Sequence, residues 1–245
     1  MNMLWTFGCS FTAEYYPVGD VDHRSTYDEY KDWRGGTLPP IWPTILSDKL
    51  NINLHNRGVG GSSNYLILNQ FLEIAHQVKE NDILIFGWTN LCRFQLVNTD
   101  EDKFNQILPA VESFPGVYVN YDALQEIFVN RTHPLWMTEI DMWVRFINLY
   151  THKIGAHIFH WTSDHALSGF FKQNYKDDHR YILGNVNMEQ TIMSEINYNT
   201  ELICGKDIAK INTETNGLVD DCHYGQYGHE TQAKIFYDHI IKFLP

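Results

Sequence analysis

The chain has 245 residues and a formal net charge of −12, which is enough length for one large domain with a substantial core. The acidic charge argues against a nucleic-acid partner, because phosphate backbones are bound by clustered Lys and Arg side chains. No apolar run reaches the roughly 18 residues that a membrane-spanning helix needs, so the sequence predicts no membrane span.

Strand and helix patterns alternate over the first 90 residues. In chain order they predict a strand at 3–8, a helix at 41–51, a strand at 52–58, a helix at 64–81 and a strand at 82–88. The last strand is an unbroken apolar run, which is typical of a strand buried on both faces. This alternation is typical of α/β proteins with a doubly wound parallel sheet.

The rest of the chain has a weaker pattern. It predicts a helix at 135–153, a strand at 156–161 and a terminal helix at 229–243, while 13–40, 100–134 and 163–216 are expected to be loop insertions. The chain contains no internal repeat, low-complexity tract or linker composition. A single domain over residues 1–245 is therefore expected.

Cysteine usage and the N-terminus bear on location. The four cysteines match no zinc-binding spacing and are too few for a disulfide scaffold, so free thiols in a reducing compartment are expected. No basic segment precedes an apolar stretch at the N-terminus, so no signal peptide is expected unless the chain is a processed fragment. These observations favour a cytoplasmic protein, and they give no indication of its oligomeric state.

Small polar residues follow each predicted strand of the first half. Ser10 follows the first strand, the glycine-rich turn containing Gly61 follows the second, and Asn90 follows the third. Ligands of open parallel sheets bind at the carboxyl ends of the strands. Near the C-terminus, Asp220 precedes His223 by three residues, a spacing that lets both side chains point the same way within one turn.

This set of residues supplies candidates for every part of an acyl-transfer site. Ser10 is the candidate nucleophile, His223 the candidate base, and Asp220 the carboxylate that orients the imidazole. The backbone N–H groups of Ser10 and Gly61 and the side-chain amide of Asn90 are candidate oxyanion donors. Such a site needs neither a metal nor a cofactor.

Four short blocks resemble those of the SGNH (GDSL-like) hydrolase superfamily, in order and in rough spacing over nearly the whole chain. "GCSFT" resembles the nucleophile block at Ser10, "NRGVGGSS" the oxyanion block at Gly61, "WTN" the block of Asn90, and "DDCH" the block of Asp220 and His223. The resemblance implies a three-layer α/β/α sandwich with a flavodoxin-like parallel sheet. It also implies a serine esterase, and no metal.

Two residues depart from the pattern of this family. Cys9 stands where the family has aspartate, and Trp88 stands where it has the glycine two positions before the asparagine. An alternative alignment places Gly87 at the block glycine and Thr89 at the asparagine position. Asn90 is preferred, because its side-chain amide can donate as strongly as the role requires. The departures motivate a second hypothesis, a non-catalytic binding or structural protein with a decayed SGNH site.

Several residues near the blocks have two interpretations. Cys9 is a rival nucleophile, because a thiolate is intrinsically reactive, but strand alternation predicts that it faces away from the site. His229 is expected in the first turn of the last helix. The histidines at 157 and 160 are expected to be structural rather than metal ligands, since no carboxylate lies at ligand spacing.

The substrate is predicted only by class. Small enzymes of the resembled superfamily often remove acetyl or other short acyl groups, and the aromatic residues of the 13–40 segment favour a carbohydrate ester. Tentative substrate-binding residues are Arg93, Trp88 and Tyr15. Transfer of the acyl group to an acceptor other than water is a third alternative.

Overall fold

The computed structural model describes residues 2–15, 28, 30–32, 34–89, 94–98, 103–107, 133–183 and 225–244. These residues belong to two compact units. The first contains Met1–Gly60 and Gly184–Pro245, and the second is Gly61–Leu183. The first unit thus combines the two ends of the chain. The single-domain interpretation stays a prediction.

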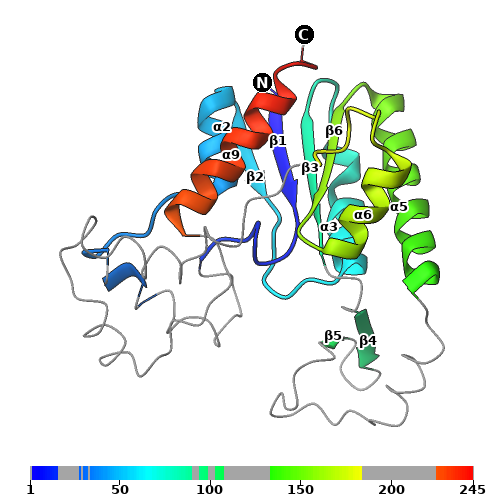
Figure 1. Cartoon of the computed structure of the whole chain (residues 1–245), viewed down its shortest axis with the longest axis horizontal. Helices are drawn as coiled ribbons and strands as arrows, with labels where there is room; N and C mark the ends of the chain where they lie inside the picture. Colours follow the sequence, from blue (N-terminus) through cyan, green and yellow to red (C-terminus); the bar gives the residue numbers. More distant parts are fainter. Residues whose placement is uncertain are drawn as a thin grey trace. The chain divides into compact units, whose positions relative to one another are not determined.

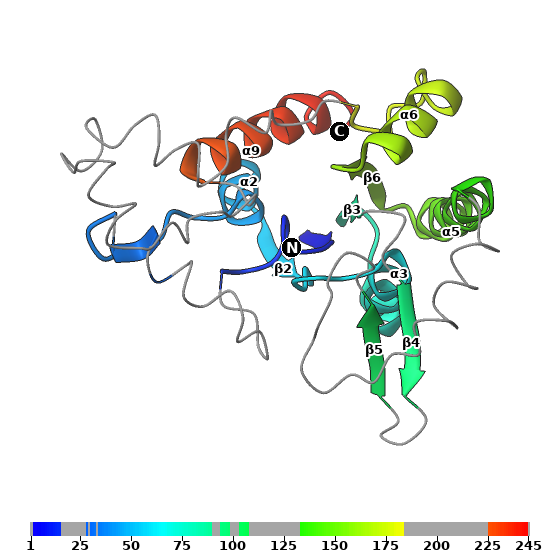
Figure 2. The same ribbon diagram turned by 60° about the horizontal axis from the view of Figure 1, so that its bottom comes forward.

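The described residues of the first unit include two parallel strands and two neighbouring helices. Strand β1 (Met3–Phe7) pairs in parallel with β2 (Asn53–Asn56), with Met3 opposite Asn53 and Thr6 opposite Asn56. Helices α2 (Trp42–Leu50) and α9 (Gln226–Ile240) lie side by side (Figures 1 and 2). These elements confirm the strands predicted at 3–8 and 52–58 and the helix predicted at 41–51, and the predicted terminal helix begins three residues earlier.

Local sequence explains both ends of α2. Pro43 lies in its first turn, where the missing N–H costs no hydrogen bond. The helix ends at Leu50 and is capped by Asn51, which has a left-handed backbone (φ 53°) and whose N–H donates to carbonyls of the last turn. The buried face of α2 includes Trp42 and Leu46, which are both fully buried.

The second unit also has parallel strands, and helices cover both faces. Strand β3 (Ile83–Trp88) pairs in parallel with β6 (His157–Thr162). Helix α3 (Asn64–Ile74), the 3-10 turn η1 (Ala75–Gln77) and α5 (His133–Ile154) lie on one side of this pair, and α6 (His165–Asn174) lies on the other (Figure 2). Every residue of β3 is buried, as its unbroken apolar run predicted.

Close packing between β3 and β6 explains the glycine within β3. A Cβ atom on Gly87 would come within 2.8–2.9 Å of the indole of Trp161, its partner on β6. Contacts this short do not occur in packed interiors. The packing of Trp161 therefore requires a glycine at position 87. This gives Gly87 a structural role, independent of the alternative alignment that places it at the glycine of the third block.

The structure corrects two predicted loops and one helix end. Strands β4 (Phe94–Asn98) and β5 (Lys103–Ile107) form an antiparallel hairpin next to α3, and α6 occupies part of the region predicted as a loop at 163–216. The helix predicted to reach residue 81 ends at Ile74 and continues only as η1. Asn81 itself has a left-handed backbone, with φ 65°, which no helix can contain.

The described residues thus form a mixed α/β protein with parallel strands and flanking helices, as the sequence predicted at the level of fold class. This architecture is compatible with a three-layer α/β arrangement. No helix in the described ranges is long and apolar enough to cross a bilayer.

His160 is buried in the core of the second unit and has a structural role there. Its Nδ1 accepts a hydrogen bond from the indole N–H of Trp88 at 3.2 Å, so the ring proton lies on Nε2. Nε2 then donates to Oδ1 of Asn148 on α5, at 2.9 Å. The side chain is fully buried. Both ring nitrogens are used within the core, which confirms the structural interpretation of this histidine.

We expect His160 to make folding sensitive to acid. Burial, followed by the positive charge of Arg180, lowers its pKa to about 3 from the ordinary 6.5, while the carboxylate of Asp178 partly opposes the shift. Below pH 6.5 the unfolded chain binds a proton that the folded chain excludes. The contribution of His160 to the free energy of unfolding therefore has its full value above pH 6.5. Below this pH the free energy of unfolding falls, by up to about 1.4 kcal/mol per pH unit.

Urea denaturation of the wild type and His160→Gln, measured between pH 7.5 and pH 4.5, tests this expectation. The variant cannot titrate at this position, so its stability should fall less steeply with acid than that of the wild type. Equal slopes for the two proteins would show that His160 does not carry the acid sensitivity.

Candidate functional site

Ser10 lies on a helical turn that follows β1 directly. The carbonyl of Cys9 accepts hydrogen bonds from the N–H groups of Thr12 (2.8 Å) and Ala13 (3.0 Å). Ser10 comes before both of these donors in the chain, so the turn makes no hydrogen bond with its N–H. The first N–H groups of any helical segment likewise have no partner within that segment. Ser10 is partly exposed, whereas Cys9 is 3% exposed. This turn presents the serine and buries the cysteine.

The amide of Asn56, at the end of β2, holds this turn in place. Its Nδ2 donates to the carbonyl of Thr12 at 2.8 Å. Its Oδ1 accepts from the hydroxyl of Thr6 at 2.9 Å and from the N–H of Gly58 at 3.0 Å. One side chain thus connects β1, the turn after β1 and the loop after β2. This role of Asn56 was not predicted from the sequence.

Gly58 allows this loop to lie directly against the turn of Ser10. A Cβ atom at Gly58 would lie 2.6 Å from the backbone nitrogen of Ala13 and 2.7 Å from the carbonyl carbon of Thr12. Both atoms are backbone, so a side-chain rotation cannot relieve the contact. The first glycine of "GVGG" is therefore required because two backbone segments come close together.

The second half of the glycine-rich turn belongs to the second unit. Gly61 has a left-handed backbone with φ 72°, a conformation that glycine adopts without strain. Two residues later, the hydroxyl of Ser63 accepts from the N–H of Leu66 at 3.2 Å and caps α3. This cap confirms the start of the helix predicted at 64–81. Gly61 therefore lies in a turn whose far end is fixed by a helix cap.

Asn64 fixes the end of β3 through two backbone hydrogen bonds. Its Nδ2 donates to the carbonyl of Thr89 at 2.9 Å, and its Oδ1 accepts from the N–H of Thr89 at 2.7 Å. Both residues are buried, with Thr89 at 2% exposure. The residue that precedes Asn90 in the chain is thus held by the start of α3. Burial also makes Thr89 a poor alternative to Asn90 as an oxyanion donor.

Four of the predicted site residues lie outside the described part of the chain. These are Asn90, Arg93, Asp220 and His223. Their roles stay predictions, as does the meeting of the site residues at one point. The described candidates for the nucleophile and the oxyanion hole are Ser10, in the first unit, and Gly61, in the second.

The structure corrects the role suggested for Trp88. Its side chain is 1% exposed, and its indole N–H donates to His160 within the core of the second unit. A side chain enclosed in this way is not available to a substrate. Tyr15 is half-buried, and the edge of its ring contacts His229, with ring centroids 5.7 Å apart. A substrate-binding role for Tyr15 stays a prediction.

Arg57, the residue after β2, carries a positive charge that acts on His55 within β2. Burial lowers the pKa of His55, and the positive charge of the nearby Arg57 lowers it further. The N–H of Arg57 donates to the carbonyl of Thr6 at 2.7 Å, which continues the parallel pairing beyond β2.

Within the described ranges, no group of three or more His, Cys, Asp or Glu side chains is arranged to hold a metal ion.

Sequence reasoning did not identify Asn56 and Asn64 as the residues that hold these loops. Both lie at an element boundary, Asn56 at the end of a strand and Asn64 at the start of a helix. That position is a usable signal, because short amide side chains commonly pair with backbone groups where an element ends. Their partners, Thr12 and Thr89, are distant in sequence and could not be inferred from it.

Comparison with known proteins adds no family assignment. No protein family model matches the sequence. A search of curated proteins finds no significant match. The function is therefore inferred from the sequence blocks and from the geometry of the described residues.

Proposed function

We propose that the protein is a serine ester hydrolase of the SGNH type, built on the three-layer α/β/α fold of that superfamily. The observation that carries the proposal is the turn after β1. It follows a buried parallel strand, exposes the hydroxyl-bearing Ser10 and buries the neighbouring thiol of Cys9. Ligand sites of parallel α/β sheets lie at this end of the strands.

The proposed reaction has two halves. His223 takes the proton of the Ser10 hydroxyl as Oγ attacks the ester carbonyl carbon, and the carbonyl electron pair moves to the oxygen. The tetrahedral intermediate collapses, and the alcohol leaves with the proton from His223. Water, deprotonated by His223, then attacks the acyl-enzyme, and the acid is released as Ser10 regains its proton. Asp220 keeps His223 in the required tautomer.

Three donors are proposed for the oxyanion: the N–H groups of Ser10 and Gly61 and the amide of Asn90. The turn of Ser10 leaves its N–H unused by the turn itself, which supports the first assignment. Asn64 holds the backbone immediately before Asn90, which supports the third, because a donor must be fixed before charge develops. Each such donor is worth roughly 3 kcal/mol of the activation barrier.

The proposed substrates are short-chain carboxylic esters, with acetylated carbohydrates as the favoured class. The aromatic residues of segment 13–40 motivate this choice, since sugar rings stack on aromatic faces. The net charge of −12 would repel anionic esters at long range. Neutral O-acyl sugars therefore fit the charge better than anionic lipids or acidic polysaccharides.

Rapid-mixing kinetics with p-nitrophenyl acetate test the acyl-enzyme. We expect a burst of p-nitrophenol, equal to the concentration of enzyme, when hydrolysis of the acyl-enzyme is the slower step. Acetate release from an acetylated xylooligosaccharide then tests the carbohydrate class. A wild-type protein that releases p-nitrophenol no faster than buffer, and no acetate from the sugar, would contradict the proposed function.

A further inference from the structure

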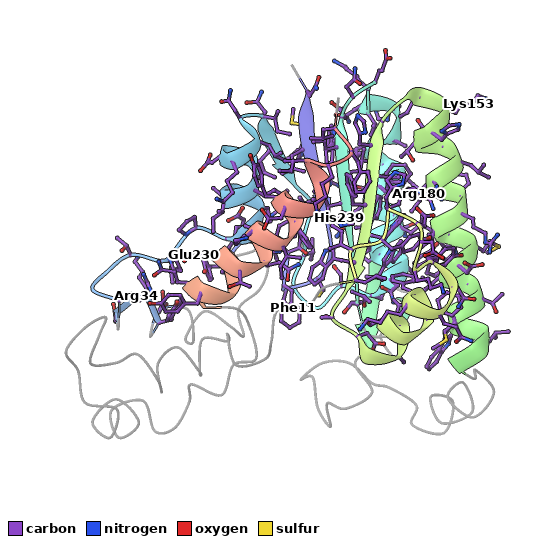
Figure 3. The ribbon with its side chains drawn as sticks, turned by 45° about the horizontal axis from the view of Figure 1, so that its top comes forward. Phe11, Arg34, Lys153, Arg180, Glu230 and His239 are labelled. Atoms are coloured by element: carbon purple, nitrogen blue, oxygen red, sulfur yellow. The ribbon has the colours of Figure 1, made fainter. Side chains whose placement is uncertain are left out.

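Trp42 connects the turn that carries Ser10 to helix α9, within the first unit. Its indole Nε1–H donates to the carbonyl of Phe11, the residue after Ser10, at 2.7 Å. Its backbone N–H donates to Nδ1 of His229 on α9 at 3.2 Å. Figure 3 labels Phe11 in the loop after β1. Trp42 thus makes one hydrogen bond toward each of two segments that are distant in sequence.

Both hydrogen bonds use N–H groups of Trp42 that have no acceptor within helix α2. Trp42 is the first residue of α2, and the N-cap residue Ile41 provides no side-chain cap, so His229 accepts from a donor that the helix cannot satisfy itself. Trp42 is fully buried, and His229 is 4% exposed. Removing the partner of a buried polar group costs about 1–3 kcal/mol, so these bonds strongly favour one arrangement.

Aromatic packing joins Trp42 to α9 a second time. The ring of Phe236 meets the Trp42 ring edge to face, with centroids 4.7 Å apart and planes at 90°. Phe236 is fully buried and lies on α9, two turns after His229. Trp42 is therefore held by α9 twice, through a hydrogen bond from its backbone N–H and through contact with its ring.

The first turn of α9 is itself anchored. The N–H of Gln226 donates to the hydroxyl of Tyr30 at 3.0 Å, and Nη2 of Arg34 donates to Oε1 of Gln226 at 2.5 Å. Figure 3 labels Arg34. Gln226 follows His223 by three residues in the sequence. The contacts of Trp42 therefore reach a helix whose start is fixed and which continues the chain after the proposed base.

We propose that Trp42 is a positioning residue for the Ser10 nucleophile. The inference rests on the proposed function. Its indole N–H fixes the carbonyl of Phe11, and with it the turn of Ser10, relative to α9. Without this bond the turn can shift while the fold persists, and a misplacement of about 1 Å costs roughly 100-fold in rate.

Trp42→Phe tests the proposal, with Phe236→Leu as the matched control. Trp42→Phe removes the indole donor and keeps an aromatic ring. We expect kcat for p-nitrophenyl acetate to fall roughly 10- to 100-fold, with KM changed little. Phe236→Leu weakens packing on the same indole but keeps the N–H···O bond. It should lower the thermal midpoint and leave kcat near that of the wild type.

A second pair of variants tests the other end of the connection. His229→Gln offers a side-chain oxygen to the N–H of Trp42, whereas His229→Leu offers no acceptor. We expect the glutamine variant to retain most of the kcat and the leucine variant to lose it, even at a temperature where both are folded by circular dichroism. This pair keeps the proposal testable if Trp42→Phe fails to fold.

The outcomes separate the two proposals. An active wild type with unchanged kcat in Trp42→Phe, or with equal losses in Trp42→Phe and Phe236→Leu, would overturn the positioning role alone. An active wild type with equal kcat in His229→Gln and His229→Leu would do the same. A wild type that is inert toward esters would overturn the proposed function, and the role of Trp42 with it.

Discussion

Ser10→Ala is expected to lower kcat/KM for p-nitrophenyl acetate by roughly 10⁴-fold or more, because the nucleophile of a triad cannot be replaced by its neighbours. Ser10 is partly exposed on its turn, so the substitution should leave the thermal midpoint nearly unchanged. Steady-state kinetics and a melting curve on the same preparation measure both quantities.

Cys9→Ser is the matched control, because it changes the adjacent residue by one atom. Cys9 is buried within the first unit, and its backbone carbonyl, not its thiol, holds the turn. We expect this variant to keep kcat near that of the wild type. A loss of activity in Cys9→Ser with retention in Ser10→Ala would reverse the assignment and make the thiol the nucleophile.

Gly58→Ala is expected to lower both the stability and the activity of the protein. The new Cβ would lie 2.6 Å from the backbone nitrogen of Ala13, so the loop after β2 must move away from the turn of Ser10. Overpacking of this kind costs about 1–3 kcal/mol of folding stability. Because the same turn carries the proposed nucleophile, kcat should also fall by roughly 100-fold. Urea denaturation and ester hydrolysis measure the two effects.

Gly169→Ala provides the comparison for Gly58→Ala. Gly169 lies within α6, and a Cβ there meets nothing within 4 Å. Alanine in a helix interior is favoured over glycine by up to about 1 kcal/mol, so this variant should be as stable as the wild type or more so. A Gly58→Ala protein with unchanged stability and activity would show that the two loops are not in the close contact described above.

The elements that could be predicted are those with strong local signals. The unbroken apolar run of β3 and the proline in the first turn of α2 are such signals, and both elements lie within one or two residues of the prediction. The β4–β5 hairpin was missed because its strands, FQLVN and KFNQI, mix polar and apolar residues without a strong alternation. They are strands because they pair with each other through hydrogen bonds, and the sequence pattern of one segment does not show this pairing.

The sequence was sufficient to predict which candidate residues follow each strand. It was not sufficient to predict the hydrogen bonds that hold those residues in place. The sequence placed Ser10 after β1 and Gly61 in a turn before α3, because a residue's place relative to an apolar run is a local property. The hydrogen bonds of Asn56, Asn64 and Trp42 join residues 25–44 positions apart. Such pairings depend on how segments pack in three dimensions, so side-chain type alone did not reveal them.

Covalent labelling tests most directly whether Ser10 is an activated nucleophile. A fluorophosphonate reacts with an activated serine by forming an Oγ–P bond as fluoride leaves. Intact mass measurement and peptide mapping then locate the adduct. We expect one adduct per chain, on Ser10, and none on Ser10→Ala. An adduct on another residue, or an unmodified protein that nonetheless hydrolyses esters, would contradict it.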